Sequence, residues 1–269
     1  MSYTGDPAIE TSNNNNGVWS LVRENLDNVM KVARPRTSHA QVVHKLGHGI
    51  VSGEFSAGEI LPGDAELVGR FKVSRTILRE AMKTLTAKVM VAPKARIGTR
   101  VTSRDKWNMF DSDVLHWHFE TGINTEFLLH LYDMRLAFEP FAASLAATHA
   151  SDADLIRLEM LATTMGDPSY SKEKRAIADM EFHILLAEVS GNPFMRTVGT
   201  LIKASLIGIF RMSNPETDSN EIADVSRTHL QLVEALRAHD AESARKQMET
   251  LIENGRNQIM SFVNSRTTA

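Results

Sequence analysis

The fold of the N-terminal part of this chain is decided by the stretch Phe71-Lys-Val-Ser-Arg-Thr-Ile-Leu-Arg-Glu-Ala-Met-Lys-Thr-Leu85. Its apolar residues recur every three or four positions, which predicts a helix with one buried face. They are Ile77, Leu78, Ala81, Met82 and Leu85. Ser74 stands where a helix N-cap belongs, and Arg75, Thr76 and Arg79 offer cations and a hydroxyl that suit phosphate oxygens and base edges. The stretch predicts a recognition helix; an amphipathic helix with a solvated basic side is the alternative.

The residues before this stretch predict two further helices. Residues 40–53 carry Val43, Leu46 and Ile50 at helical spacing, and a turn-rich connector at 55–63 leads to a short helix at 64–71. Two helices therefore precede the recognition helix, which is the order of a helix-turn-helix domain.

The residues after it predict a basic hairpin. Residues 89–92 have an extended pattern, 93–96 a turn pattern, and 97–102 the pattern of a returning strand. A hairpin in this place would be the wing of a winged helix-turn-helix, where a minor groove or phosphates could be reached. Its cations are Lys94, Arg96 and Arg100.

Charge is divided unevenly along the chain. Residues 39–103 hold 10 Lys and Arg against 5 Asp and Glu, a net charge of +5, whereas residues 104–269 hold 16 against 24, a net charge of -8. The overall charge of -3 thus hides a basic module joined to an acidic one. This distribution is typical of a phosphate-binding head on a regulatory body.

Composition excludes several classes of protein. The 269 residues include no Cys, which removes disulfides, thiolate metal sites and a Cys nucleophile, and 42% are hydrophobic, enough for a substantial core. We find no long apolar run and no signal pattern, so we expect a cytoplasmic protein without a membrane span. The polar tract at 12–17 predicts a flexible N-terminal extension over residues 1–38.

Beyond Arg104 the pattern is helix after helix. Capping signals and Gly/Pro breaks delimit a bundle of six or seven helices, so the fold class is mainly α. We place the helices at 112–121, 124–149, 152–165, 171–190, 194–212, 219–238 and 240–263. The predicted core consists of Leu128, Leu131, Phe138, Leu145, Leu158, Leu161, Ile184, Leu185, Leu201, Leu206, Leu232, Leu236, Met248 and Ile252. The domains are then 39–103 for the DNA-binding head, 104–122 for an interdomain linker helix and 123–269 for the bundle.

Few residues of the bundle are candidates for binding a metal ion or a ligand. Asp179 and His183 lie four apart, on one face of a helix, where they could meet a common ion or ligand. His229 and Arg135 occur in other helical runs. By spacing alone, such a pair is more often a hydrogen-bonded core pair or a surface coincidence than a metal site.

The N-terminal motif resembles the GntR family of bacterial transcription regulators. Its pattern is matched by Gly53, Phe55, Ala57-Gly58, Leu61-Pro62, Val73-Ser74-Arg75-Thr76, Arg79-Glu80-Ala81 and Leu85. Ala57 replaces a Pro of the family, and Asp64-Ala65 replaces a Glu-Arg whose Arg commonly touches DNA. The resemblance implies DNA contacts from Ser74, Arg75, Thr76, Arg79, Lys94 and Arg96.

The second half resembles the FCD ligand domain of the FadR subgroup. The matching landmarks are Arg135 with Glu139-Pro140, Asp179-Met-Glu-Phe-His183 with Ser190-Gly-Asn-Pro193, and the run from His229 to Arg245. In many members an Asp and three His hold a divalent metal such as Zn, Ni or Mn, and an organic acid completes the site. Asp179, His183 and His229 align with three of these ligands, while the fourth His appears replaced near Leu251. In a metal-free alternative, Arg135, His183 and His229 would hydrogen-bond the acid.

These observations lead to one expectation about function. We expect a homodimeric repressor that binds double-stranded operator DNA and is released by a small carboxylate such as a sugar acid. The segment at 106–117 is similar to the interdomain region of members that govern galactonate use; an aromatic linker helix is its simpler interpretation. The competing classes are a metal-dependent hydrolase built on Asp179, His183 and His229, and a helical adaptor whose basic half binds protein. The hydrolase lacks a recognisable catalytic motif, so we expect no enzyme.

Overall fold

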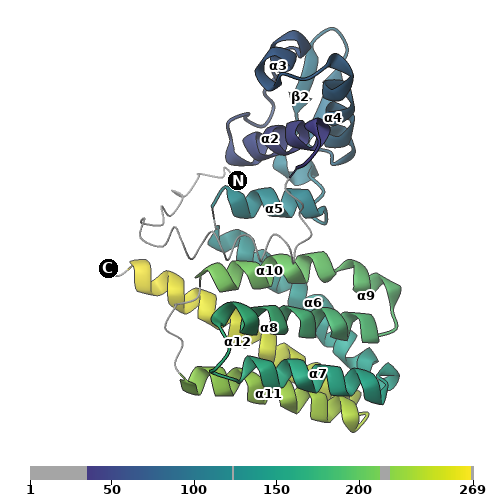
Figure 1. Ribbon diagram of the computed structural model, residues 1–269, viewed down its shortest axis with the longest axis vertical. Helices are drawn as coiled ribbons and strands as arrows, with labels where there is room; N and C mark the ends of the chain where they lie inside the picture. The colour runs from purple at the N-terminus through teal and green to yellow at the C-terminus, as the bar shows by residue number, and fades with distance from the viewer. Residues whose placement is uncertain (1–34, 123, 213–218, 268–269) are drawn as a thin grey trace. The chain divides into compact units, whose positions relative to one another are not determined.

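The structure of the chain, a computed structural model, describes residues 35–122, 124–212 and 219–267 (Figure 1). Its contacts divide the chain after Asn124 into two compact units. The predicted N-terminal extension lies outside the described residues, except for positions 35–38.

The first unit contains the three predicted helices. They are α2 (Ser38–Ser52), α3 (Asp64–Phe71) and α4 (Arg75–Ala87). The Ser74 hydroxyl accepts a hydrogen bond from the backbone N–H of Ile77 at 3.2 Å, so it is the N-cap of α4 as its position predicts. Leu78, Ala81 and Leu85 are buried against α2, whereas Ile77 and Met82 are half-buried at the edge of the same face.

The wing follows α4. Strands β1 (Val91–Lys94) and β2 (Gly98–Val101) pair antiparallel, with Val91 opposite Val101. The first strand begins two residues later than its pattern predicts, because Val89 has a left-handed backbone. Pro93 lies within β1 instead of starting the turn; β1 is paired in the sheet with β2 alone, and such an edge strand tolerates a residue without an N–H.

The left-handed conformation of Val89, with φ of 60°, strains a β-branched side chain just after α4. A Gly adopts this conformation without the steric penalty, so Val89→Gly is expected to raise the free energy of unfolding by about 1 kcal/mol. Urea denaturation of the purified variant measures the change. Val89→Ala retains the Cβ and serves as the control, with a smaller gain; equal gains from both variants would contradict the assignment of the strain to backbone conformation.

The helix α5 (Ser112–Glu120) completes the first unit, after the short 3-10 turn η1 (Arg104–Lys106). Trp117 of α5 is buried in the core of the winged helix and covers Gly47 of α2 so closely that a Cβ at Gly47 would lie 2.3 Å from its ring. Its indole N–H donates to Nδ1 of His44 at 3.0 Å. Within this unit α5 is therefore fixed to α2, and the role of residues 104–122 between domains stays a prediction.

Seven α-helices of the described residues form the second unit (Figure 1). They are α6 (Thr125–His149), α7 (Asp152–Met165), α8 (Lys172–Val189), α9 (Pro193–Thr197), α10 (Gly199–Met212), α11 (Ser219–Arg237) and α12 (Ala241–Thr267). The single helix predicted at 194–212 is wrong: it is divided at Val198, next to Gly199, a residue with low helix propensity.

The core of this unit lies between α6, α8, α11 and α12. Helix α6 packs along α12, and α7 packs against both α8 and α11. Most of the predicted core residues are buried, but Phe138, Leu145, Leu161 and Ile184 are half-buried. Tyr132 and Phe182, which the apolar pattern did not single out, are fully buried instead. No helix in the described ranges has the length and apolarity needed to cross a bilayer.

Candidate functional site

The first candidate site is the exposed face of α4 with the wing. Arg75, Thr76 and Arg79 lie exposed on the first turns of α4, and Lys94 and Arg96 lie exposed on the hairpin. The buried residues of α4 occupy the opposite face, so the basic side chains are available to a ligand outside the domain. Arg100, by contrast, donates to the backbone carbonyl of Gly58 at 2.8 Å and ties the wing to the connector before α3.

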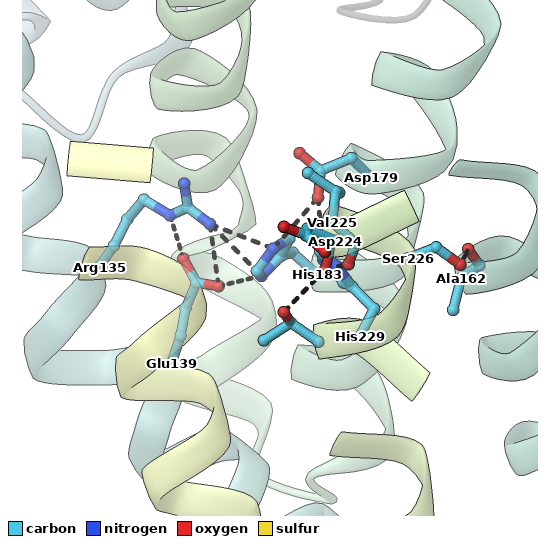
Figure 2. A network of polar contacts seen from close by, with 10 residues as sticks. Arg135, Glu139, Ala162, Asp179, His183, Asp224, Val225, Ser226 and His229 are labelled. Atoms are coloured by element: carbon cyan, nitrogen blue, oxygen red, sulfur yellow. Dashed lines mark hydrogen bonds and ion pairs between the residues drawn. The ribbon is translucent and has the colours of Figure 1, made fainter. Parts of the chain in front are cut away.

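The second candidate site lies inside the helical unit, where three predicted residues come together. Asp179 and His183 come from α8 and His229 from α11, and one ligand atom from each lies within 4.8 Å of the other two. Oδ1 of Asp179 is 3.4 Å from Nε2 of His183 and 3.1 Å from Nε2 of His229 (Figure 2). Both imidazoles are almost fully buried, whereas the Asp179 side chain is 27% exposed.

Each imidazole turns its Nε2 toward Asp179 because its Nδ1 is engaged elsewhere. Nδ1 of His229 lies 2.8 Å from the carbonyl oxygen of Val225, which can only accept, so Nδ1 carries the proton. Nε2 then presents a lone pair, and this buried atom has no hydrogen-bond partner among the described residues although the Asp179 carboxylate is close. Two facing lone pairs repel each other unless a cation lies between them.

Glu139 of α6 orients the other imidazole, and sequence reasoning did not assign it this role. Its Oε2 lies 2.5 Å from Nδ1 of His183, and its Oε1 lies 2.5 Å from Nε of Arg135 (Figure 2). A carboxylate that binds Nδ1 of a histidine fixes the ring so that Nε2 points toward Asp179. Carboxylates hold metal-bound histidines in the same way, from the side opposite the metal. The signal available in the sequence was the spacing of four between Arg135 and Glu139, which places them on one helix face.

The electrostatics of this group favour ionised side chains. Burial alone would raise the pKa of Glu139, but Arg135 and His183 outweigh it and lower the pKa to about 2. Burial would likewise raise the pKa of Asp179, yet the adjacent imidazoles of His183 and His229 hold that pKa far below its usual range. For His183, burial lowers the pKa, but the Glu139 charge together with hydrogen bonds to Asp179 and Glu139 outweighs burial and raises it. Either a proton or a metal ion at Nε2 of His183 would therefore be stabilised by the negative charges of Asp179 and Glu139.

The donor set fits a divalent metal with open coordination positions. Two imidazole nitrogens and one carboxylate oxygen are three ligands of the type that Zn²⁺ and related ions take, and three protein ligands leave room for oxygen atoms of a bound molecule. Near Leu251, α12 carries the half-buried Leu251 and the buried Ile252. In the described part of the chain, the group that could hold an ion consists of Asp179, His183 and His229, without a ligand from α12.

A winged helix followed by a helical domain in which an Asp and two His converge defines a class of DNA-binding regulator. The family model for bacterial regulatory proteins of the gntR family matches residues 38–101, and the FCD domain model matches residues 130–254. The HTH-type transcriptional regulator YieP of Escherichia coli K12 is 33% identical over 78% of this chain and 90% of its own length. The chain belongs to the GntR family, with an FCD domain.

Two further comparisons agree with this assignment. The galactonate operon transcriptional repressor of Escherichia coli K12 is 29% identical, over 79% of this chain and 92% of that protein. A solved structure of Lar, which controls the expression of the Listeria monocytogenes agr system, shares the fold with a TM-score of 0.56 at 22% identity, covering 85% of this chain and 99% of Lar. The chain is thus a transcription regulator and not an enzyme, which rules out the hydrolase alternative.

Proposed function

We propose that this regulator is a repressor that a small carboxylate, such as a sugar acid of the galactonate type, releases from its operator. The observation that carries the proposal is that the buried His183 and His229 converge with the partly exposed Asp179 beside the buried Arg135. So many polar groups are costly in a helical core unless each has a partner. Arg135 can bind a carboxylate through a charge-assisted hydrogen bond. The likeness to the galactonate operon repressor supports the same class of effector.

Asp179, His183 and His229 would hold a divalent metal of the Zn, Ni or Mn type. Such an ion supplies a Lewis acid that binds carboxylate and hydroxyl oxygens of the effector. Glu139 keeps His183 in the tautomer that the metal needs, and the carbonyl of Val225 does the same for His229. In the metal-free alternative, His183 is an imidazolium, which the raised pKa supports, and binds the acid together with Arg135 and His229.

The DNA-binding surface consists of Ser74, Arg75, Thr76, Arg79, Lys94 and Arg96. The Arg side chains of α4 would meet base edges in a major groove, and the wing cations would meet phosphates or the minor groove.

We propose that the protein is a homodimer, so that its two DNA-binding domains reach the half-sites of a pseudo-palindromic operator. We also propose that it works in the cytoplasm, where the chromosome lies. The domains would be 39–103 for reading DNA, 104–122 for coupling and 123–269 for sensing. The effector can shift the equilibrium only by its difference in affinity for the two states.

Replacing His229 by Ala is expected to abolish the response to the effector while leaving operator affinity unchanged, because the imidazole belongs to the ligand-sensing domain and not to the DNA-binding domain. The measurement is a gel shift with the DNA upstream of the chain's own gene, titrated with D-galactonate, together with metal analysis of the purified protein.

His130→Ala removes an exposed imidazole from the same domain and is the matched control. It should retain full release of the DNA. If His229→Ala also retains full release, His229 has no part in the sensor; if it loses metal but still responds to the acid, the metal-free arrangement is favoured.

A further inference from the structure

The buried polar group that remains unexplained is the phenol of Tyr132. Its side chain is fully buried in the core of the helical unit, yet among the described residues nothing accepts its O–H proton, since the neighbouring Arg135 guanidinium can only donate. Buried hydroxyls are nearly always hydrogen-bonded, because leaving one unpaired costs free energy that a Phe at the same position would not lose. Tyr132 therefore has an O–H donor that the described part of the fold does not use.

The position of Tyr132 relates this hydroxyl to the sensor. Tyr132, Arg135 and Glu139 are spaced by three and four residues on α6 and share one face of the helix. The guanidinium carbon of Arg135 is 5.1 Å from the centre of the Tyr132 ring. Burial raises the pKa of Tyr132 well above its usual range; the adjacent Arg135 guanidinium lowers it by less, and the charges of Asp179 and Glu139 raise it further. The phenol thus stays protonated next to the group proposed to bind the effector.

We propose that Tyr132 is a specificity-determining residue of the sensor, whose hydroxyl hydrogen-bonds an oxygen atom of the bound acid. The inference rests on the proposed function and deepens it. An oxygen-rich acid held by Arg135 through its carboxylate would provide a partner for the adjacent phenol, and binding would then satisfy the hydroxyl. An acid that leaves the phenol unpaired would be bound less tightly, because the site would keep its buried, unsatisfied donor.

Tyr132→Phe tests the proposal by removing one oxygen atom and leaving the ring in place. Calorimetric titration of D-galactonate into the full-length variant should show an affinity lower than that of the wild type by a factor of up to about ten. The ligand-free variant, dialysed against a chelator, should melt at the same temperature as the wild type or about 2–4 °C higher, because the unpaired hydroxyl is gone. Nickel content after reconstitution with Ni²⁺ alone should be unchanged, since the phenol is not a ligand of the metal.

Tyr170→Phe makes the same chemical change at a half-buried tyrosine beside Lys174 and should alter neither affinity nor nickel content. A lower melting temperature of ligand-free Tyr132→Phe would overturn the proposal, because it would show that the hydroxyl has a structural partner. Unchanged galactonate affinity would overturn it as well. If the wild type binds no galactonate, the effector class of the proposed function fails, and the ligand-free melting temperature alone decides for Tyr132: a rise supports the unpaired donor and a fall refutes it.

Discussion

Glu139→Gln is expected to lower the free energy of unfolding by about 3–5 kcal/mol, the largest loss of stability that we predict for a single isosteric change. Arg135 is only 3% exposed, and its counter-charge is the Glu139 carboxylate, 2.5 Å from Nε. The amide keeps the size of the side chain but leaves a buried guanidinium without a charged partner. Urea denaturation of the metal-free protein, followed by circular dichroism, measures the loss.

The matched control is Glu159→Gln, which removes the same charge from an ion pair at the surface. Glu159 lies 2.7 Å from Arg237, but both side chains are about half exposed. Water and side-chain entropy reduce the value of such a pair to at most about 1 kcal/mol. If the two variants lost equal stability, Glu139 could not be the compensating charge of a buried site.

Arg75→Ala and Arg79→Ala are each expected to weaken operator binding by about 1–3 kcal/mol, if each side chain reads a base, and the double variant should lose most of the sequence-specific binding. Both side chains are exposed on the first turns of α4, on the face opposite its buried residues. Gel shifts with the chain's own upstream DNA, in competition with unrelated DNA at fixed salt, separate specific from phosphate-driven affinity.

Arg237→Ala removes the same charge from the sensor domain and should leave DNA binding unchanged. Lys94→Ala distinguishes a phosphate contact from a base contact: it should weaken binding to all sequences alike and reduce the salt dependence of binding. Operator affinity that is unaffected in both α4 variants would contradict the assignment of the recognition helix.

The local structure of the chain follows closely from its sequence. The cap at Ser74, the helix at 64–71 and the boundaries of α6, α7 and α8 were predicted to within a residue or so, because capping side chains, apolar spacing and Pro/Gly breaks act over a few neighbouring residues. The errors are local as well. The strand at 89–92 was placed too early because nothing in an apolar run reveals that Val89 would have a left-handed backbone.

The sensor site shows the limit of such prediction. Asp179 and His183 could be paired from their spacing, and the family resemblance added His229 and Arg135. The resemblance did not reveal that Glu139 connects Arg135 to His183, nor that the buried phenol of Tyr132 finds no acceptor for its proton among the described residues. Both facts depend on side chains from different helices, and Glu139 and His183 are 44 positions apart.

By itself, then, the sequence determined the order of the helices, the basic face of α4 and the residue types able to bind a metal or an acid, because all of these depend on composition and short-range periodicity. Only the tertiary structure decided which nitrogen of each imidazole faces Asp179, which carboxylate balances Arg135 and which buried hydroxyl lacks an acceptor in the described part of the chain. The physical reason is that these properties are set by distances of about 3 Å between helices. Such distances depend on how the whole bundle packs.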